Sequence, residues 1–248
     1  MKKVCIFANQ KGGVGKTACS LNVGFELARR GKKVLLVDTD PQGNLTSWAG
    51  LDPDSFSITL YDIMKGTKRV EDVMVEVREN ILLLPSNILL ASVEREIFAA
   101  IGYERILKKA FHSVHDRFDH IILDSPPSLG ALTVNGLVAS DEVYITVACE
   151  HLSVIGTNKL LETIDAIREN YNPHLEIGRV IPTMYSNTVL ANEMLKQLSL
   201  FFGEKITKTV IRRNVKIGES SAMGQSVIHY DPDSIGARDF VSLVEEIV

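Results

Sequence analysis

The sequence has few cysteines and no long apolar run, and these absences exclude several classes of protein. Its three cysteines, Cys5, Cys19 and Cys149, are scattered, and no two have the spacing of a metal site or a disulfide framework. No apolar run approaches the roughly 20 residues that a membrane-spanning helix needs. The apolar run 4–8 is too short for the core of a signal peptide, so it predicts a buried strand. We therefore expect a cytoplasmic protein with reduced thiols.

The chain also has little excess charge of either sign. Its 27 lysines and arginines against 31 aspartates and glutamates give a formal charge of −4. Mild acidity argues against a protein that is basic over its whole surface, although a whole-chain sum does not detect a local basic patch. With 248 residues, 45% of them hydrophobic, the chain is long enough to bury a core without disulfides or structural metals.

Short apolar runs alternate along the chain with longer segments of helical periodicity. The runs typical of strands buried on both faces are 4–8, 34–37, 81–84, 121–123, 143–147 and 177–181. The segments with helical spacing include 16–30, 103–115, 129–139 and 157–170. This alternation predicts a single α/β domain over residues 1–248, with a doubly wound, mostly parallel sheet and helices on both faces.

A glycine-rich segment, 10–17, follows the first predicted strand and opens the first predicted helix. Its sequence is QKGGVGKT. Glycines let backbone N–H groups converge on phosphate oxygens, a lysine reaches the outer phosphates, and a threonine hydroxyl ligates Mg²⁺. A glycine-rich turn with a surface lysine is the alternative, but the strand before and the helix after favour a phosphate-binding loop. The residues expected around the phosphates are Gly12, Gly13, Val14, Gly15, Lys16, Thr17 and Ala18.

Acidic residues follow two further predicted strands. Asp38 and Asp40 come after the second strand, and their spacing on an extended backbone makes them point the same way. Asp124 follows the strand 121–123. The carboxyl ends of parallel strands face the crevice where ligands bind, so Asp124 is expected to hold Mg²⁺ through water. A polar turn at 38–44 and a helix-capping Asp124 are the alternative interpretations.

These motifs resemble those of the ParA/MinD family of P-loop ATPases with a deviant Walker A loop, xKGGxGK[ST]. In that family the early lysine, here Lys11, reaches across a nucleotide-sandwich dimer to the phosphates bound by the partner. The resemblance implies ATP and Mg²⁺ as cofactors. It also implies that Asp40 orients the attacking water and that Asp38 supports Mg²⁺ or Lys16. The expected catalytic residues are Lys11, Lys16 and Asp40, and the expected metal site is Thr17, Asp38 and Asp124.

The resemblance covers nearly the whole chain and points to the short ParA proteins of the Soj type. Further matches are Glu150, then Thr183, Met184 and Tyr185, and finally Arg213, Asn214 and Val215. Proteins of this type begin at the ATPase strand, so we expect no N-terminal winged-helix domain. They bind non-specific DNA as ATP-bound homodimers, and a small ParB-like activator stimulates hydrolysis. The resemblance thus implies a weak ATPase that segregates a plasmid or chromosome and is nucleoid-associated when it binds ATP.

A basic segment near the C-terminus indicates DNA binding independently of the resemblance. Between Glu204 and Glu219 there are five cations and no acid. A dimer would double the phosphate contacts of such a patch, whereas a solvated charged face is the alternative. The resemblance places Arg213 and Asn214 near adenine. The expected DNA contacts are Lys205, Lys208, Arg212 and Lys216.

Three other functions compete with DNA partition. The family often has a DNA-contacting arginine after Tyr185, but Ser186, Asn187 and Thr188 stand there, which keeps open a ParA-like positioner of a protein cargo. A MinD-like membrane ATPase needs a basic amphipathic C-terminal helix, and residues 239–248 carry acids instead. An iron–sulfur reductase needs several bridging thiolates, and Cys149 alone cannot hold a four-iron cluster. DNA partition without a membrane partner is the main prediction.

Overall fold

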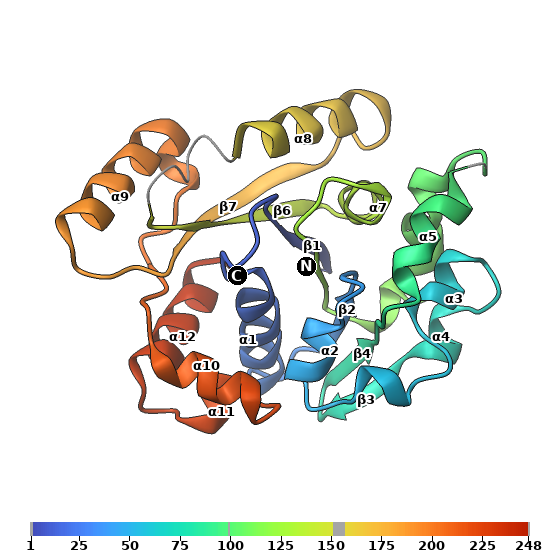
Figure 1. The fold of residues 1–248 in the computed structure, drawn as a ribbon, viewed down its shortest axis with the longest axis horizontal. Coiled ribbons are helices and arrows are strands. Elements are labelled where there is room, and N and C mark those ends of the chain that lie inside the picture. The colour runs from blue at the N-terminus through green and yellow to red at the C-terminus, as the bar shows by residue number, and fades with distance from the viewer. Residues whose placement is uncertain (1, 99, 151–156, 248) are drawn as a thin grey trace.

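A seven-stranded sheet runs through the molecule (Figure 1). The computed structural model describes residues 2–98, 100–150 and 157–247. The strand order is β3-β4-β2-β5-β1-β6-β7, and every neighbouring pair is parallel except the antiparallel pair β3–β4. The strands are β1 (Lys3–Ala8), β2 (Val34–Asp38), β3 (Val75–Arg78), β4 (Ile81–Leu84), β5 (His120–Asp124), β6 (Glu142–Ala148) and β7 (Glu176–Thr183).

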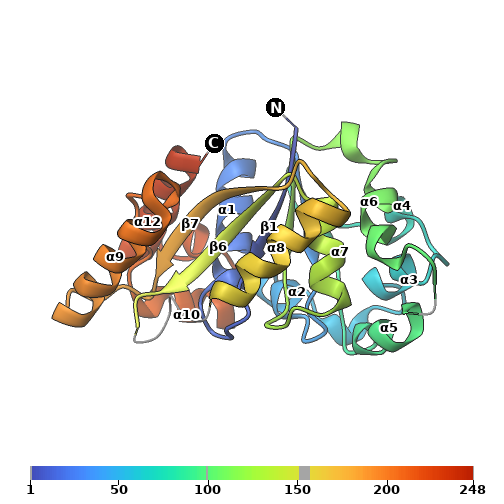
Figure 2. The ribbon, with the colours of Figure 1, turned by 90° about the horizontal axis from the view of Figure 1, so that it is seen from above.

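Helices cover both faces of this sheet, with α7 and α8 on one side and α1 and α12 on the other (Figure 2). Among the described residues, none of these helices combines the length and the apolar character needed to cross a membrane. The helices are α1 (Lys16–Arg29), α2 (Asn44–Trp48), α3 (Leu60–Met64), α4 (Val70–Val73), α5 (Leu90–Ile97), α6 (Ile106–Phe111), α7 (Ala131–Ala139), α8 (Asn158–Asn170), α9 (Val189–Phe202), α10 (Val215–Ala222), α11 (Val227–Tyr230) and α12 (Ile235–Ile247).

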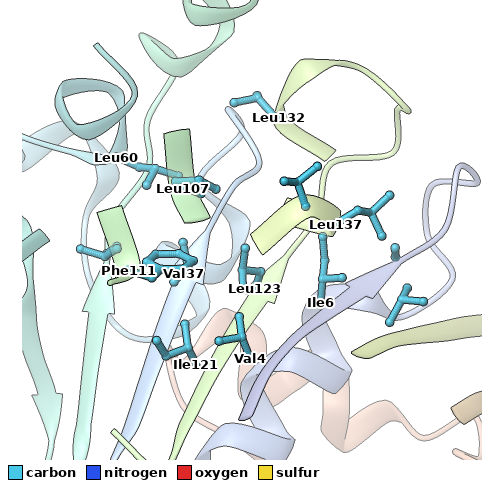
Figure 3. Packing of buried hydrophobic residues seen from close by; sticks show 14 of the residues in the cluster. Val4, Ile6, Val37, Leu60, Leu107, Phe111, Ile121, Leu123, Leu132 and Leu137 are labelled. Carbon is cyan, nitrogen blue, oxygen red and sulfur yellow. The ribbon is translucent and has the colours of Figure 1, made fainter. Parts of the chain in front are cut away.

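Successive side chains of the central strands point to opposite faces and build two hydrophobic cores. Val4 and Ile6 of β1 pack with Leu123 of β5 in the core under α5–α8, which Figure 3 shows from close by. On the other face Phe7 packs with Phe240 of α12 in the core that includes α1. Burying a side chain of this size is worth roughly 1.5–3 kcal/mol, so the sheet is held rigidly from both sides.

The strand order changes direction at β1. This change shows at which edge of the sheet a ligand is expected to bind. From β1 the chain runs outward to β2, β3 and β4, returns to β5 beside β1, and then continues on the other side with β6 and β7. In open α/β sheets, ligands bind outside the carboxyl ends of the strands at such a switch point. The loops after β1, β2 and β5 therefore meet at one edge.

The predicted fold is confirmed, and all six predicted strands are present. Strand β3 was missed. Val75 and Val77 are half-buried and alternate with the exposed Glu76 and Arg78, which is typical of an edge strand. The hairpin to β4 turns through Asn80, whose φ is 64°, a conformation that asparagine tolerates better than most residues. The short alternation of apolar and charged residues and the following asparagine were the sequence features that could have predicted this strand and its turn.

The predicted helix 103–115 is too long. Only α6 (Ile106–Phe111) is α-helical, and 3-10 turns flank it at Tyr103–Arg105 and His115–Arg117. The backbone N–H groups of His112 and Val114 bond three residues back rather than four, which tightens the chain and ends the α-helix. The apolar spacing continues through these turns, so periodicity alone did not mark the end.

Candidate nucleotide-binding site

The loop between β1 and α1 leads directly into the first turn of α1. Gly13 and Gly15 have φ of 71° and 83°, in the left-handed region where a side chain is strained. Gly15 is the N-cap of α1 and offers no side-chain acceptor, so the first N–H groups of the helix are open to a ligand. The Thr183 hydroxyl of β7 donates to the Val14 carbonyl oxygen at 2.9 Å. The loop is thus fixed in a shape suited to a phosphate.

The two lysines of this loop lie in different surroundings. Lys16 is 7% exposed, and its Nζ donates to the Lys11 carbonyl oxygen at 3.3 Å. Burial lowers the pKa of Lys16, while the nearby Asp124 and Asp40 oppose that shift. The Lys11 side chain is 46% exposed, and its Nζ lies 3.9 Å from Glu150 Oε2. Lys16 therefore lies within the loop, and Lys11 lies at its rim.

Asp124 closes the bottom of the site at the end of β5. It is fully buried, and the Ser20 hydroxyl of α1 donates to its Oδ1 at 2.9 Å. Its Oδ2 has no hydrogen-bond partner within the described part of the chain. Burial raises the pKa of Asp124 to about 6, and the neighbouring hydroxyls of Thr17 and Ser20 oppose that shift. A buried, unpartnered carboxylate oxygen beside a threonine hydroxyl fits a Mg²⁺ ion bound through water.

Asp38 and Asp40 follow β2 but have different partners. Asp38 is fully buried and accepts hydrogen bonds from the Thr46 N–H at 2.8 Å, the Thr46 hydroxyl at 2.7 Å and the Asp40 N–H at 3.2 Å. Burial and the neighbouring Asp124 raise the pKa of Asp38 to about 8. Asp40 is 7% exposed and borders the same cavity as the phosphate loop. Asp38 anchors α2 through Thr46, and its predicted support of Mg²⁺ or Lys16 stays a prediction.

A cavity of about 650 Å³ joins the phosphate loop to the C-terminal third of the chain. A nucleotide fits a cavity of this size. The phosphate loop forms one wall, and Asn44, Ser47 and Trp48 of α2 form a second wall. The third wall includes Arg213 and Asn214 before α10. The structure therefore brings the two residues expected near adenine to the same cavity as the phosphate loop.

Several residues at this cavity were not found from the sequence. They are Ser47 and Trp48 of α2 and Ile217 of α10. Met184 after β7, which was predicted only as a match to the family and without a role, lines the cavity as well. Met184 has a φ of 52°, and non-glycine residues in this strained conformation cluster at functional sites. Strain depends on tertiary packing and leaves no sequence pattern. Trp48 did carry a signal, since it is the single tryptophan of the chain.

The cations of the basic segment have unequal surroundings. The Arg212 guanidinium binds both carboxylate oxygens of the buried Asp239. Arg213 Nη2 donates to Glu150 Oε1 at 2.8 Å, and Lys216 Nζ donates to Glu219 Oε2 at 2.8 Å. The side chains of Lys205 and Lys208 are exposed and make no ion pair with any residue that the structure describes. The DNA contacts of Lys205, Lys208, Arg212 and Lys216 stay predictions.

The fold and this site define a class of protein. A glycine-rich loop at the N-terminus of α1, its buried Lys16 and the buried Asp124 on a neighbouring strand belong to P-loop nucleotide-binding proteins. The second lysine, Lys11, marks the deviant Walker A type.

Comparison with known proteins assigns the family. Residues 1–177 match the family model described as "AAA domain". The chain is 41% identical to the chromosome-partitioning ATPase Soj of Treponema pallidum, over 100% of this chain and 98% of that protein. It is 35% identical to the chromosome partitioning protein ParA of Caulobacter vibrioides, over 99% of this chain and 94% of that protein. The chain belongs to the ParA/MinD family of ATPases, as its motifs predicted.

Solved structures agree with this assignment. A cobyrinic acid a,c-diamide synthase from Mycobacterium smegmatis, solved with an ATP analog and magnesium, has a TM-score of 0.90 at 33% identity. The match covers 99% of this chain and 93% of that chain. MinD of Pyrococcus horikoshii with Mg-ADP shares the fold, with a TM-score of 0.80 at 24% identity over 99% of this chain and 95% of that one. ATP and Mg²⁺ are therefore the cofactors of this protein, as expected.

Proposed function

We propose that this protein is an ATPase that partitions DNA. ATP binding would join two copies of the chain into a sandwich dimer that holds non-specific DNA. Hydrolysis to ADP and phosphate, weak alone and stimulated by a small ParB-like partner, would then release the dimer. The whole of residues 1–248 would act as one ATPase domain in this cycle, nucleoid-associated in its ATP-bound state, and its cargo would be a plasmid or chromosome.

The observation that carries this proposal is the difference in burial between the two lysines of the loop. Lys16 is buried beside Asp40 and Asp124, where it can neutralise the phosphates of its own nucleotide. Lys11 is half exposed at the rim, so its ammonium can reach a phosphate bound by a second copy. Bound ATP thus supplies a contact between the two copies that does not form without the nucleotide.

The remaining groups at the cavity supply the other parts of phosphoryl transfer to water. Thr17 and Asp124 would hold Mg²⁺, which neutralises developing charge on the phosphates, with support from Asp38. Asp40 lies at the cavity next to the loop and would orient the attacking water. Since little covalent chemistry is needed, positioning by these residues and charge neutralisation by Lys16 account for the reaction.

DNA binding would rest on the exposed part of the basic segment. Lys205 and Lys208 offer ammonium groups to DNA phosphates without first leaving an ion pair within the described residues. Arg212 and Lys216 would contribute less, because Asp239 and Glu219 already offset their charges. Because the chain has a net charge of −4, one copy of this patch would attract DNA weakly. Binding would therefore depend on the two copies that a dimer provides.

A protein cargo is the second candidate. The arginine that the family often has after Tyr185 is missing, and three of the five cations of the basic segment are paired with acids. Both observations favour a weaker DNA surface. The ATP-dependent dimer would be the same, and only the surface on which it works would differ.

The test measures binding to an arbitrary duplex DNA without nucleotide, with ADP and Mg²⁺, and with ATP and Mg²⁺. It compares the wild type with Lys11→Ala, and Lys33→Ala serves as the control. Lys33 is also an exposed lysine, but it lies just before β2 at the opposite edge of the sheet. Fluorescence anisotropy of the DNA and light scattering of the protein report DNA binding and dimer formation.

We expect DNA binding and dimers only with ATP, both lost in Lys11→Ala and retained in Lys33→Ala. Equal or absent DNA binding in all three conditions, with ATP-dependent dimers retained, would reject the DNA role and favour the protein cargo. Dimers that form equally with ADP, or in Lys11→Ala, would reject the sandwich mechanism itself.

A further inference from the structure

Helix α2 is tied to the interior along one side and borders the nucleotide cavity along the other. Leu45 and Thr46 are fully buried, and Thr46 bonds to Asp38 and accepts a hydrogen bond from the Ser86 N–H at 3.1 Å. The remaining residues of the helix, Asn44, Ser47 and Trp48, line the cavity. This short helix therefore presents a fixed face to the nucleotide.

A close contact joins the end of α2 to the end of α10, although about 175 residues separate them in the sequence. The Trp48 indole N–H donates to the Gln225 carbonyl oxygen at 2.9 Å. Next to this bond the backbones of Gly50 and Gly224 touch, since a Cβ on Gly224 would come within 2.7 Å of the Gly50 Cα. Both glycines have positive φ, of 86° and 62°. The contact fixes both the position of α10 and the orientation of the indole.

The fixed indole borders the same cavity as residues of α10. Its N–H edge is bonded to Gln225 outside the cavity, so an apolar part of the ring is left for the cavity wall. Ile217, Gly218 and Ser221 of α10 line the cavity as well. The phosphate-binding groups Lys16 and Thr17 belong to the other end, at the N-terminus of α1. The indole and α10 therefore give the cavity an apolar lining in addition to its phosphate-binding groups.

We propose that Trp48 contacts the base of the bound nucleotide and is a specificity-determining residue of this site. Stacking against an aromatic ring contributes to base binding without requiring a particular hydrogen bond, so Trp48 raises affinity for a nucleotide over a bare polyphosphate. The proposal rests on the proposed binding of ATP at the cavity. It also explains why α2, which follows the Asp40 loop, is joined to α10.

The first test compares ligands with and without a base. Calorimetry measures the affinities of ADP with Mg²⁺ and of inorganic tripolyphosphate with Mg²⁺, for the wild type, Trp48→Ala, Trp48→Leu and Trp48→Phe. We expect Trp48→Ala and Trp48→Leu to bind ADP about tenfold more weakly, and tripolyphosphate as the wild type does. Trp48→Phe keeps a ring and loses less than about threefold. Circular dichroism confirms that each variant is folded.

The second test uses the unmodified chain, because Trp48 is its single tryptophan and thus the sole source of indole fluorescence. ADP with Mg²⁺ should change the emission saturably, with the dissociation constant found by calorimetry. Tripolyphosphate should leave the emission unchanged. In Lys16→Ala, the response to ADP should disappear together with binding.

The outcomes separate this inference from the proposed function. Wild-type affinity for ADP in Trp48→Ala, an equal loss for ADP and tripolyphosphate, or unchanged emission at saturating ADP would each overturn the role of Trp48 alone. Failure of the wild type to bind ADP, or unchanged binding in Lys16→Ala, would instead overturn the nucleotide site.

Discussion

The phosphate loop and the basic segment 205–216 both looked like ligand-binding motifs in the sequence, yet they differ in the structure. In the loop, neighbouring residues serve one site, and Gly13, Gly15 and Lys16 converge on one cavity. In the basic segment, neighbouring residues have separate partners. Arg212 pairs with Asp239, and Arg213 pairs with Glu150. A run of like charges in sequence is therefore not a set of equally free cations in the structure.

The cause of this difference is the kind of information that each motif carries. A phosphate loop constrains the backbone, since glycines at fixed positions and the start of a helix determine where N–H groups point. A run of lysines and arginines says nothing about backbone geometry. Its long side chains pair with whichever acidic residues the fold brings near. The comparison can be tested by removing one charge at a time from each region.

The largest effect is expected for Lys16→Ala, which removes the buried cation of the loop. Nucleotide binding should be lost, because Lys11 lies only at the rim and the triphosphate would meet the carboxylates of Asp40 and Asp124 without the buried cation that offsets their charge. Calorimetry with ATP and Mg²⁺ measures this, and Lys205→Ala is the control from the basic segment. Unchanged affinity in Lys16→Ala would remove the basis for the site.

Asp40→Ala tests the catalytic half of the same site and should have the next largest effect. Asp40 borders the cavity without forming part of the glycine loop. ATP should therefore still bind and still form dimers, while turnover falls by orders of magnitude because the attacking water loses its positioning group. Phosphate release under single-turnover conditions separates the two steps. Wild-type turnover in the variant would mean that another group orients the water.

The sequence predicted six of the strands, a mostly parallel sheet and the phosphate-binding loop, because each depends on residues close together in the chain. Asp124 was found because it directly follows an apolar strand. The base end could not be predicted in the same way, since Trp48 acquires its orientation from the Gln225 carbonyl and Met184 its strained backbone from the fold. Such features follow from contacts between distant parts of the chain.

Arg212 shows the same limit within the basic segment. Its partner Asp239 is 27 residues away in the sequence and 5% exposed in the structure. Arg212→Ala would leave this carboxylate unpaired, although the backbone N–H of residue 212 would still donate to it, as it does at 2.9 Å in the wild type. Because the arginine side chain is 45% exposed, we expect a loss of only about 1–2 kcal/mol in the free energy of unfolding. Thermal unfolding measures this against Lys208→Ala, which should match the wild type.

The smallest expected effect is on the salt dependence of DNA binding, which should differ between variants of the basic segment. Lys208 makes no ion pair within the described residues, so Lys208→Ala should lower the slope of log affinity against log salt by about one for each DNA phosphate that this lysine neutralises. Arg212→Ala should change that slope less, because Asp239 already offsets the arginine's charge. Wild-type slopes in both variants would remove these two residues from the DNA surface, whereas slopes lowered equally in the two variants would mean that the Arg212–Asp239 pair opens on DNA. The charge run read from the sequence would then describe the DNA-bound surface better than the ion pairs of the free chain do.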